Sequence, residues 1–349
     1  MAEYKVIHGT LVEHKTSDPL AAGVDNGSWS SGGSLNTARR RVGAAGIQTA
    51  AIAFGGSSDP PVRANAEQYD GTSWTEVGDL NTAREAMGPS SKGSQTAALA
   101  AGGNPITTAN ELWDGSSWTE VGDINTGREG LGGGGTSTAA FVAGGSTATA
   151  RQVLSETWDG SSWTETTDIN TARTAGGAVS EDSTASLIFG GFVTPSRNDE
   201  TELWNGSTWT EMNDMGSNKD QLASLGTTTA ALSAGGTPVK SDVELWDGTS
   251  WTETTELNTA KTGAEGAGIQ TSGIVYGGST PPYVATTEFW NGTSWTELND
   301  MSTARYLVAP AGTSAAALAT GGDPGPSTIG TNATEEWTAS LSNFTITSS

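Results

Sequence analysis

The stretch ELWDGSSWTEVGDINTGR at residues 111–128 decides how the chain folds, because it returns almost unchanged as ETWDGSSWTETTDINTAR at residues 156–173. Each copy holds a glutamate two residues before an aromatic side chain, an Asp-Gly or Asn-Gly turn, a second tryptophan and a polar stretch ending in a basic residue. The glutamate occurs seven times, as Glu67, Glu111, Glu156, Glu202, Glu244, Glu288 and Glu335. Such a period of about 44 residues is the signature of a repeat architecture.

Within each repeat the pattern predicts four short strands. Two runs of small residues lead to a Gly-Gly pair, and two strands joined by the Asp-Gly or Asn-Gly turn follow it. The Gly-Gly pairs begin at Gly55, Gly102, Gly144, Gly190, Gly235, Gly277 and Gly321. Glycine and threonine are too frequent for helices. Because four strands every 40–50 residues make one propeller blade, we expect an all-β fold, a seven-bladed β-propeller of four-stranded blades.

The two ends of the repeat region predict how the ring closes. The strand at residues 28–33 carries a repeat tryptophan but has no third strand before it, whereas the strand at 334–339 has no tryptophan strand after it. We therefore expect the N-terminal strand to complete the seventh blade, which removes two free sheet edges. The strand-like residues 343–347 could compete for that edge or add a fifth strand. Residues 1–25 are expected to form an extended docking arm, and residues 26–349 the propeller.

Composition narrows the function. The 349 residues include 39 acidic and 16 basic side chains, for a net charge of −23, and no cysteine. The two histidines, His8 and His14, both lie near the N-terminus. Thiol nucleophiles, thiolate metal sites and most histidine triads are therefore excluded, and nucleic acid would be repelled. With no apolar run of membrane-spanning length and no signal sequence, we expect no membrane insertion. No cofactor, metal or catalytic residue is predicted.

The side chains that recur in every repeat are expected to be structural. The second tryptophans should pack between neighbouring blades; they are Trp29, Trp74, Trp118, Trp163, Trp209, Trp251 and Trp295. The basic residues should form buried pairs with the repeated glutamates; they are Arg39, Arg84, Arg128, Arg173, Lys219, Lys261 and Arg305. The alternatives are sugar binding by the aromatic rings, an anion held by a ring of cations, and calcium held by the Asp-Gly turns.

The connections after each Gly-Gly pair differ from blade to blade, whereas those after each fourth strand are nearly uniform. In a propeller both sets lie on one face, and function tends to sit on loops held by a rigid frame. The candidate ligand- or partner-binding residues are therefore Arg63, Arg151, Phe192, Arg197, Lys240 and Tyr283.

The order of Gly-Gly, Glu-x-aromatic, turn, tryptophan and basic residue over residues 26–340 resembles the kelch repeat. The phrase Trp-Asp-Gly-Ser-Ser-Trp-Thr-Glu, followed by Asn-Thr-Ala-Arg, is similar to kelch-like proteins of tailed phages that infect marine bacteria. The turns depart from the Asp-Pro and longer loop of many family members. The resemblance implies a protein of the phage particle without enzyme activity.

As such a protein, the chain would be a virion component of the tail, a fibre or the capsid surface. It would bind a host-surface glycan or receptor, or neighbouring virion subunits, and form homo-oligomers within the particle. The arm would attach it to other virion proteins. The alternatives are a propeller-fold carbohydrate-active enzyme, which would need a unique pair of carboxylates in the central channel, and an intracellular kelch scaffold.

Overall fold

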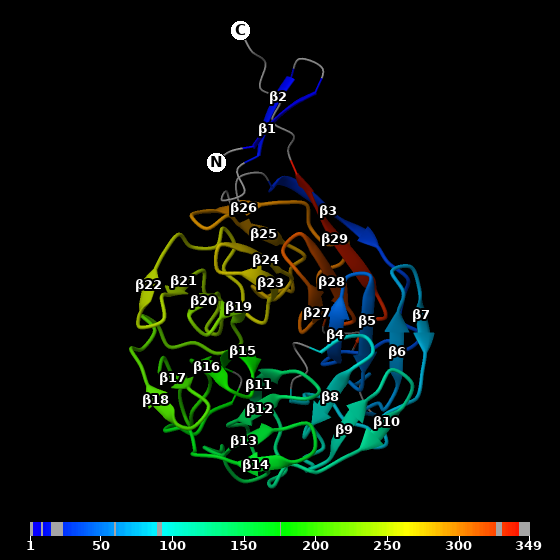
Figure 1. The fold of residues 1–349 in the computed structure, drawn as a ribbon, viewed down its shortest axis with the longest axis vertical. Coiled ribbons are helices and arrows are strands. Elements are labelled where there is room, and N and C mark those ends of the chain that lie inside the picture. The colour runs from blue at the N-terminus through cyan, green and yellow to red at the C-terminus, as the bar shows by residue number, and fades with distance from the viewer. Residues whose placement is uncertain are drawn as a thin grey trace.

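The computed structural model describes residues 3–7, 10–14, 24–58, 61–88, 93–174, 176–325 and 330–341. Seven sheets stand around a central axis like the sectors of a disc, so the chain is a seven-bladed β-propeller (Figure 1). In each blade neighbouring strands are antiparallel, and they follow one another from the axis to the rim in chain order. The exception is the seventh blade, whose outer strand comes from the start of the chain. Among the described residues, none belongs to a helix with the length and hydropathy of a membrane span.

The blades are numbered along the chain, and the strands of each blade follow one another from the axis outward. The first three blades comprise β4 (Gly43–Ile47), β5 (Ala50–Phe54), β6 (Ala66–Tyr69) and β7 (Trp74–Glu76); β8 (Ala98–Ala101), β9 (Asn110–Trp113) and β10 (Trp118–Glu120); β11 (Gly132–Gly135), β12 (Ala140–Ala143), β13 (Ser155–Trp158) and β14 (Trp163–Glu165). In blade two the place of the inner strand is marked by Gly88, which bridges Ala101; residues 89–92 lie outside the described residues.

The other four blades have the same order of strands. They comprise β15 (Gly177–Asp182), β16 (Ala185–Phe189), β17 (Thr201–Trp204) and β18 (Trp209–Glu211); β19 (Ala223–Thr227), β20 (Ala230–Ala234), β21 (Val243–Trp246) and β22 (Trp251–Glu253); β23 (Glu265–Ile269), β24 (Ser272–Tyr276), β25 (Thr287–Trp290) and β26 (Trp295–Glu297); β27 (Ala309–Gly312), β28 (Ala316–Thr320), β29 (Thr334–Leu341) and β3 (Val24–Ser31).

The ring closes as the sequence predicted. Strand β3 pairs with β29, with Ser31 opposite Glu335 and Trp29 opposite Trp337. Both strands have eight residues, whereas the third strands of the other blades have four and the fourth strands have three, so this ladder continues beyond the edge of the disc. The residues 343–347, which the sequence suggests as a further strand, lie outside the described residues.

The arm predicted at residues 1–25 forms a hairpin in its described part. Strand β1 (Glu3–Ile7) pairs with β2 (Thr10–His14), and the two form a separate sheet outside the disc, on the side of the rim where β3 and β29 lie (Figure 1). The propeller begins at Val24, the first residue of β3, close to the predicted boundary. The docking role of this hairpin stays a prediction.

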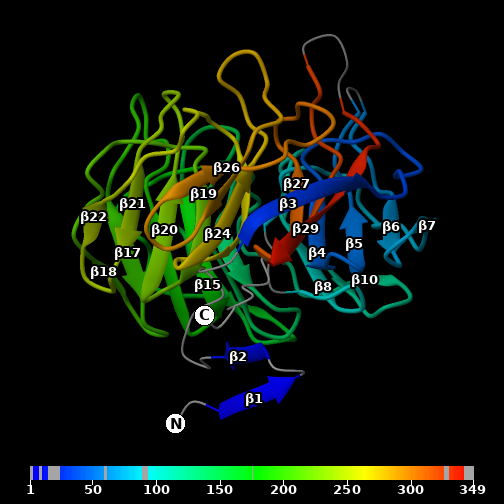
Figure 2. The same ribbon diagram turned by 90° about the horizontal axis from the view of Figure 1, so that it is seen from above.

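The disc has two faces of different construction. The Gly-Gly face holds the connections from second to third strands and from each fourth strand to the next blade. The Asp-Gly face holds the hairpins between first and second strands and the turns between third and fourth strands. Figure 2 shows the disc from the side, with β1 and β2 below it and the long orange and red connections of blades six and seven above it, on the Gly-Gly face.

Indole rings fill the space between blades. The tryptophans of the third and fourth strands lie in pairs, as at Trp158 and Trp163, whose ring centroids are 5.6 Å apart. Each fourth-strand indole also faces the third strand of the preceding blade, and the Trp209 N–H donates to Ser155 Oγ across that joint at 3.0 Å. Tyr69 replaces tryptophan in blade one, and its hydroxyl donates to Glu336 of blade seven at 2.5 Å. This exception therefore lies at the joint where the ring closes.

Each Gly-Gly pair is hydrogen-bonded to the connection that leads into the next blade. The backbone N–H of Gly145 donates to the carbonyl oxygen of Arg173 at 2.9 Å, and the same bond recurs at all seven joints. Gly144 has φ of +64°, and a Cβ on it would lie 2.6 Å from that carbonyl oxygen. Glycine is therefore required both for the left-handed backbone and for the close approach. At the seventh joint Gly322 donates to Arg39, so the contact runs around the whole ring.

Candidate binding face

The Gly-Gly face brings the variable and the uniform connections together, as predicted. In each blade the residue after the repeated cation bridges the residue after Gly-Gly, as Thr174 does with Phe192 and Tyr306 with Asp323. The variable loops are thereby held against the frame at their bases, and their tips project from the face.

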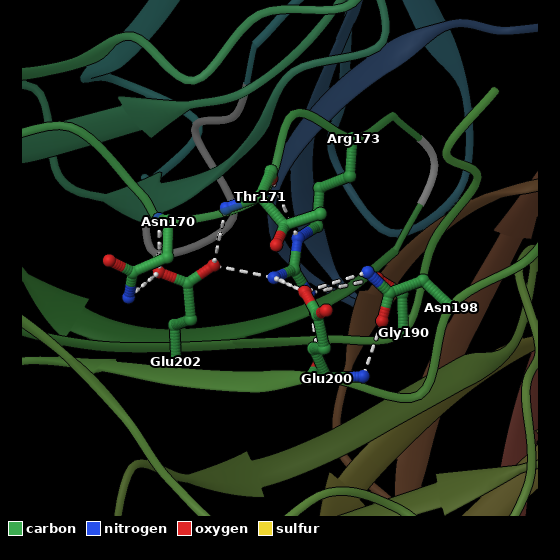
Figure 3. Close-up of polar contacts among 7 residues, drawn as sticks. All are labelled: Asn170, Thr171, Arg173, Gly190, Asn198, Glu200 and Glu202. Atoms are coloured by element: carbon green, nitrogen blue, oxygen red, sulfur yellow. Dashed lines mark hydrogen bonds and ion pairs between the residues drawn. The ribbon is translucent and has the colours of Figure 1, made fainter.

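Beneath this face lie the buried pairs between repeated cations and glutamates, and the predicted pairing is confirmed. Figure 3 shows the pair of blade four, in which Arg173 contacts Glu202 Oε1 at 2.5 Å. The other oxygen of Glu202 accepts bonds from the backbone and the side chain of Asn170, at 2.6 and 3.0 Å. The seven pairs are Arg39–Glu67, Arg84–Glu111, Arg128–Glu156, Arg173–Glu202, Lys219–Glu244, Lys261–Glu288 and Arg305–Glu335.

These pairs are almost fully enclosed, and no side chain of the seven cations exceeds 5% exposure. Desolvation lowers the pKa of Arg128, opposed by the charge of Glu156, and it lowers the pKa of Lys261 in the same way, opposed by Glu288. Both oxygens of the glutamate are occupied where the Asn-Thr connection is present. The recurrent cations are therefore committed to the frame and are not available on the surface.

The remaining basic side chains are concentrated on one face. Outside the buried pairs, six basic residues occur in the described part of the propeller, and all six lie in Gly-Gly face connections: Arg40, Arg41, Arg63, Arg151, Arg197 and Lys240. By contrast, the outer strands expose a recurring glutamate, which gives an acidic rim made of Glu76, Glu120, Glu165, Glu211, Glu253 and Glu297. The Gly-Gly face also carries acidic side chains, and four of the six basic residues are paired with them, as Arg40 is with Asp323. Among the described propeller residues, a basic side chain that could bind an anionic partner is therefore found on this face alone.

Three of the six predicted site residues meet between blades three and four. The Arg151 guanidinium carbon lies 4.2 Å from the centre of the Phe192 ring, and that of Arg197 lies 5.9 Å from it. We call these three residues the Arg–Phe–Arg cluster. Arg197 is paired with Asp220 at 2.9 Å, whereas Arg151 contacts Thr194 and has no carboxylate partner among the described residues. Arg151 is therefore available to a carboxylate, sulfate or phosphate group.

The other three predicted residues lie apart from this cluster. Arg63 donates to Ser58 Oγ at 2.9 Å in blade one, and Lys240 is paired with Asp242 at 3.0 Å in blade five. Tyr283 stacks on Tyr306, with ring centroids 5.3 Å apart and planes 15° from parallel. Desolvation and the nearby charge of Asp323 raise the pKa of Tyr283. The six residues thus form one cluster and three separate positions.

The structure also shows residues that the sequence prediction missed. Tyr306 stacks on Tyr283 and donates to Gln221 Oε1 at 2.9 Å, which links the connections that precede blades seven and five. Tyr306 and Gln221 follow Arg305 and Lys219 by one and two residues. Alignment of the seven connections would have found them, because these two positions vary within an otherwise uniform segment.

A cavity of about 380 Å³ occupies the centre of the disc. It is lined mainly by glycine, alanine and other small or apolar residues of the inner strands. Of the described residues that line it, Glu265 is the one ionisable side chain. A second cavity of about 190 Å³ adjoins it, where Arg41, Ala86 and Leu307 of the Gly-Gly face also approach Glu265. Glu265 therefore lies where the central channel meets its mouth.

The Asp-Gly turns act as local caps. Asp114 Oδ1 accepts the backbone N–H groups of Ser116 and Ser117 at 2.8 and 2.9 Å and the Ser116 hydroxyl at 2.7 Å. The Ser116 hydroxyl bond and these backbone bonds lower the pKa of Asp114 to about 2. Asn205 makes the same backbone bonds without a charge. In the part of the chain that the structure describes, no three acidic or histidine side chains gather as metal ligands would.

Known proteins give no further indication of the site. No model of a known protein family matches this chain, and no curated protein matches it in sequence.

Proposed function

We propose that this chain is a binding protein without enzyme activity, whose Gly-Gly face holds an anionic ligand at the Arg–Phe–Arg cluster. The observation that carries the proposal is the position of the basic side chains outside the buried pairs. In a chain of net charge −23, the described basic groups of the propeller that are not in buried pairs all lie on this face. A molecule bearing acidic groups would therefore find its described basic partners on one face of the disc.

The cluster favours an acidic sugar as the ligand. Arg151 offers a guanidinium without a carboxylate partner among the described residues, and the partly exposed Phe192 ring offers an apolar surface beside it. Acidic sugars combine a carboxylate, which suits bidentate binding by arginine, with C–H groups that pack on aromatic rings. A host-surface glycan that contains uronic or sialic acid fits this chemistry.

The kelch-like order of the repeats and their similarity to proteins of marine tailed phages support a place in the virion. We envisage a tail, fibre or capsid-surface component in which the β1–β2 arm attaches to other virion proteins and several copies assemble together. The positions of β1 and β2 favour this arrangement, because they lie on the opposite side of the disc from the long Gly-Gly connections (Figure 2). Attachment would thus leave the Gly-Gly face directed outward, toward a host receptor or a neighbouring subunit.

Glycan binding by matched variants tests the proposal. The Arg151→Gln/Phe192→Ala variant should bind uronate- or sialate-bearing glycans at least about tenfold more weakly, because a charge-assisted bond and an apolar contact are both lost. The Arg63→Gln variant removes the same charge from the same face in blade one and should bind as the unchanged protein does. Equal binding by the two variants, with both folded, would show that the cluster is not the site.

The carbohydrate-active enzyme remains the alternative. It would require two carboxylates at the channel, and Glu265 is the one acidic side chain among the described lining residues. Release of reducing sugar from a bound glycan, lost on Glu265→Gln, would favour the enzyme over the binding protein.

A further inference from the structure

Glu265 departs from the pattern of the inner strands. Each inner strand begins with a residue paired to the last residue of the second strand, and this first position holds Gly43, Gly132, Gly177, Ala223, Glu265 and Ala309 in six blades, with Gly88 bridging in the seventh. Six of the seven positions therefore carry at most a methyl group. Glu265 therefore has no equivalent at the first inner-strand position of the other six blades.

The surroundings of Glu265 leave its carboxylate without a partner. No hydrogen bond or ion pair joins it to any described residue, although Arg41 lines the same mouth. Arg41 is engaged with Glu85 at 3.4 Å. The other ionisable groups nearby are Tyr276 of β24 and Tyr306 of the connection before β27. Water can reach Glu265 through the channel, but protein encloses the side chain, and the resulting desolvation raises its pKa to about 8.

The wall of the channel offers further hydrogen-bond acceptors besides this carboxylate. The inner strands β4, β11, β15, β19, β23 and β27 each form the edge of a sheet. Alternate N–H and C=O groups of an edge strand are unpaired. The small side chains leave those groups uncovered along a cavity of about 380 Å³.

We infer that the central channel binds a primary ammonium group on a slender alkyl chain, with the ammonium on Glu265 and neighbouring backbone carbonyls. An ammonium group has three donors and no acceptor, which suits one carboxylate and several carbonyl oxygens. A divalent metal ion would require more carboxylate ligands than this site offers. The alkyl chain would lie along the glycine and alanine wall. The inference is independent of the anionic ligand proposed for the Gly-Gly face.

Two sources could supply such a group, a free polyamine or the lysine side chain of a partner protein. The probes are accordingly cadaverine and Nα-acetyl-lysine methylamide, titrated into the full chain by calorimetry at physiological salt. Binding of cadaverine alone identifies a free amine, and binding of the lysine derivative identifies a partner's side chain. Either result supports the inference if it depends on Glu265.

The variants separate a specific site from general attraction to an acidic protein. Glu265→Gln keeps the shape of the side chain, and Glu265→Ala restores the residue that Ala223 and Ala309 have at the same position, so folding is secured. Both should weaken binding about tenfold or more through loss of the charged acceptor. Glu120→Gln makes the same change in net charge on the acidic rim and should leave binding unchanged. Equal affinity of Glu265→Ala and the unchanged protein would overturn the inference.

Proton release provides a second measurement. At pH 7 the free Glu265 is mostly protonated, and an alkylammonium ion, charged up to about pH 10, stabilises the ionised form. Binding at pH 7 should therefore release up to one proton, detected by comparing buffers of different ionisation enthalpy. Release should disappear at pH 9, where the carboxylate is already ionised. Binding without proton release at pH 7, or competition by sodium with no amine binding, would refute the assignment.

Discussion

The indole N–H groups of the fourth strands allow a test of how the blades are joined. Four of these groups bond a hydroxyl on the preceding blade, at 2.8–3.0 Å; the pairs are Trp29–Thr287, Trp74–Thr334, Trp209–Ser155 and Trp251–Thr201. Trp118, Trp163 and Trp295 have no acceptor among the described residues. The equivalent acceptor position for Trp295 is Val243, which is fully buried in the same cluster. We predict that Val243→Thr stabilises the protein.

The magnitude follows from two terms. Providing a partner for a buried unpaired N–H contributes about 1–3 kcal/mol. Replacing a buried methyl by a hydroxyl costs about 1 kcal/mol of apolar burial. The net gain is therefore about 1 kcal/mol or somewhat more. With an unfolding entropy of about 2.1 cal/mol/K per residue, a disc of this size should melt about 1–2 °C higher.

The reverse substitution is the matched control. Thr334→Val removes the Oγ1 acceptor that lies 2.9 Å from the indole nitrogen of Trp74, and it should lower the free energy of unfolding by a similar amount. Urea denaturation measures both variants, and NMR of the ¹⁵N-labelled indoles should show a downfield shift of a single N–H signal in Val243→Thr. If Val243→Thr is destabilising while Thr334→Val is neutral, hydrogen bonding of the indoles contributes nothing to the joints.

Three further predictions concern the frame. Arg128→Ala should cost a few kcal/mol in urea denaturation, because it leaves Glu156 buried without its ion pair; an unchanged midpoint would contradict the pairing. Gly144→Ala should lower the free energy of unfolding by roughly 2 kcal/mol or more, because its φ of +64° and the Arg173 carbonyl both exclude a side chain. Gly78→Ala is the control, because a Cβ there would lie no closer than 3.4 Å to a neighbouring atom. The pKa values of four turn aspartates, Asp70, Asp114, Asp159 and Asp247, are lowered from 3.8 to about 2. Their contribution to stability should therefore be present above pH 4 and be lost as the pH falls toward 2. Replacing all four by asparagine, as at Asn205, should reduce that acid-dependent loss in pH-jump denaturation, and an identical acid profile would contradict the prediction.

Periodicity made most of the frame predictable. The number of blades, the closure by β3 and the buried cation pairs follow from marks that recur in phase, because a feature repeated seven times belongs to the architecture. The hydrogen bond from each Gly-Gly pair to the connection into the next blade was not predicted, because it joins backbone atoms and no side-chain pattern indicates it. The same holds for Asn170 and its equivalents, because their uniform position in the sequence does not reveal that they bond the glutamate.

The candidate site was predictable only in part. The variable loops identified the face, but they could not show that Arg151 and Arg197 would meet over Phe192, because loops of different length and composition carry no register. Glu265 was missed for a different reason. It lies in runs of glycine and alanine, whose alignment between blades is weak until strand pairing aligns the seven starting positions.

The pairing of β3 with β29 has a consequence for synthesis of the chain. Val24 leaves the ribosome about 300 residues before the strand that it must join, which at about 5–20 residues per second is a delay of roughly 15–60 s. The earliest strand of the disc is thus the last to find its neighbour, and during this interval its tryptophan has no place to pack. A rearranged gene that moved residues 24–31 behind residue 341 would produce both strands together and shorten that exposed period.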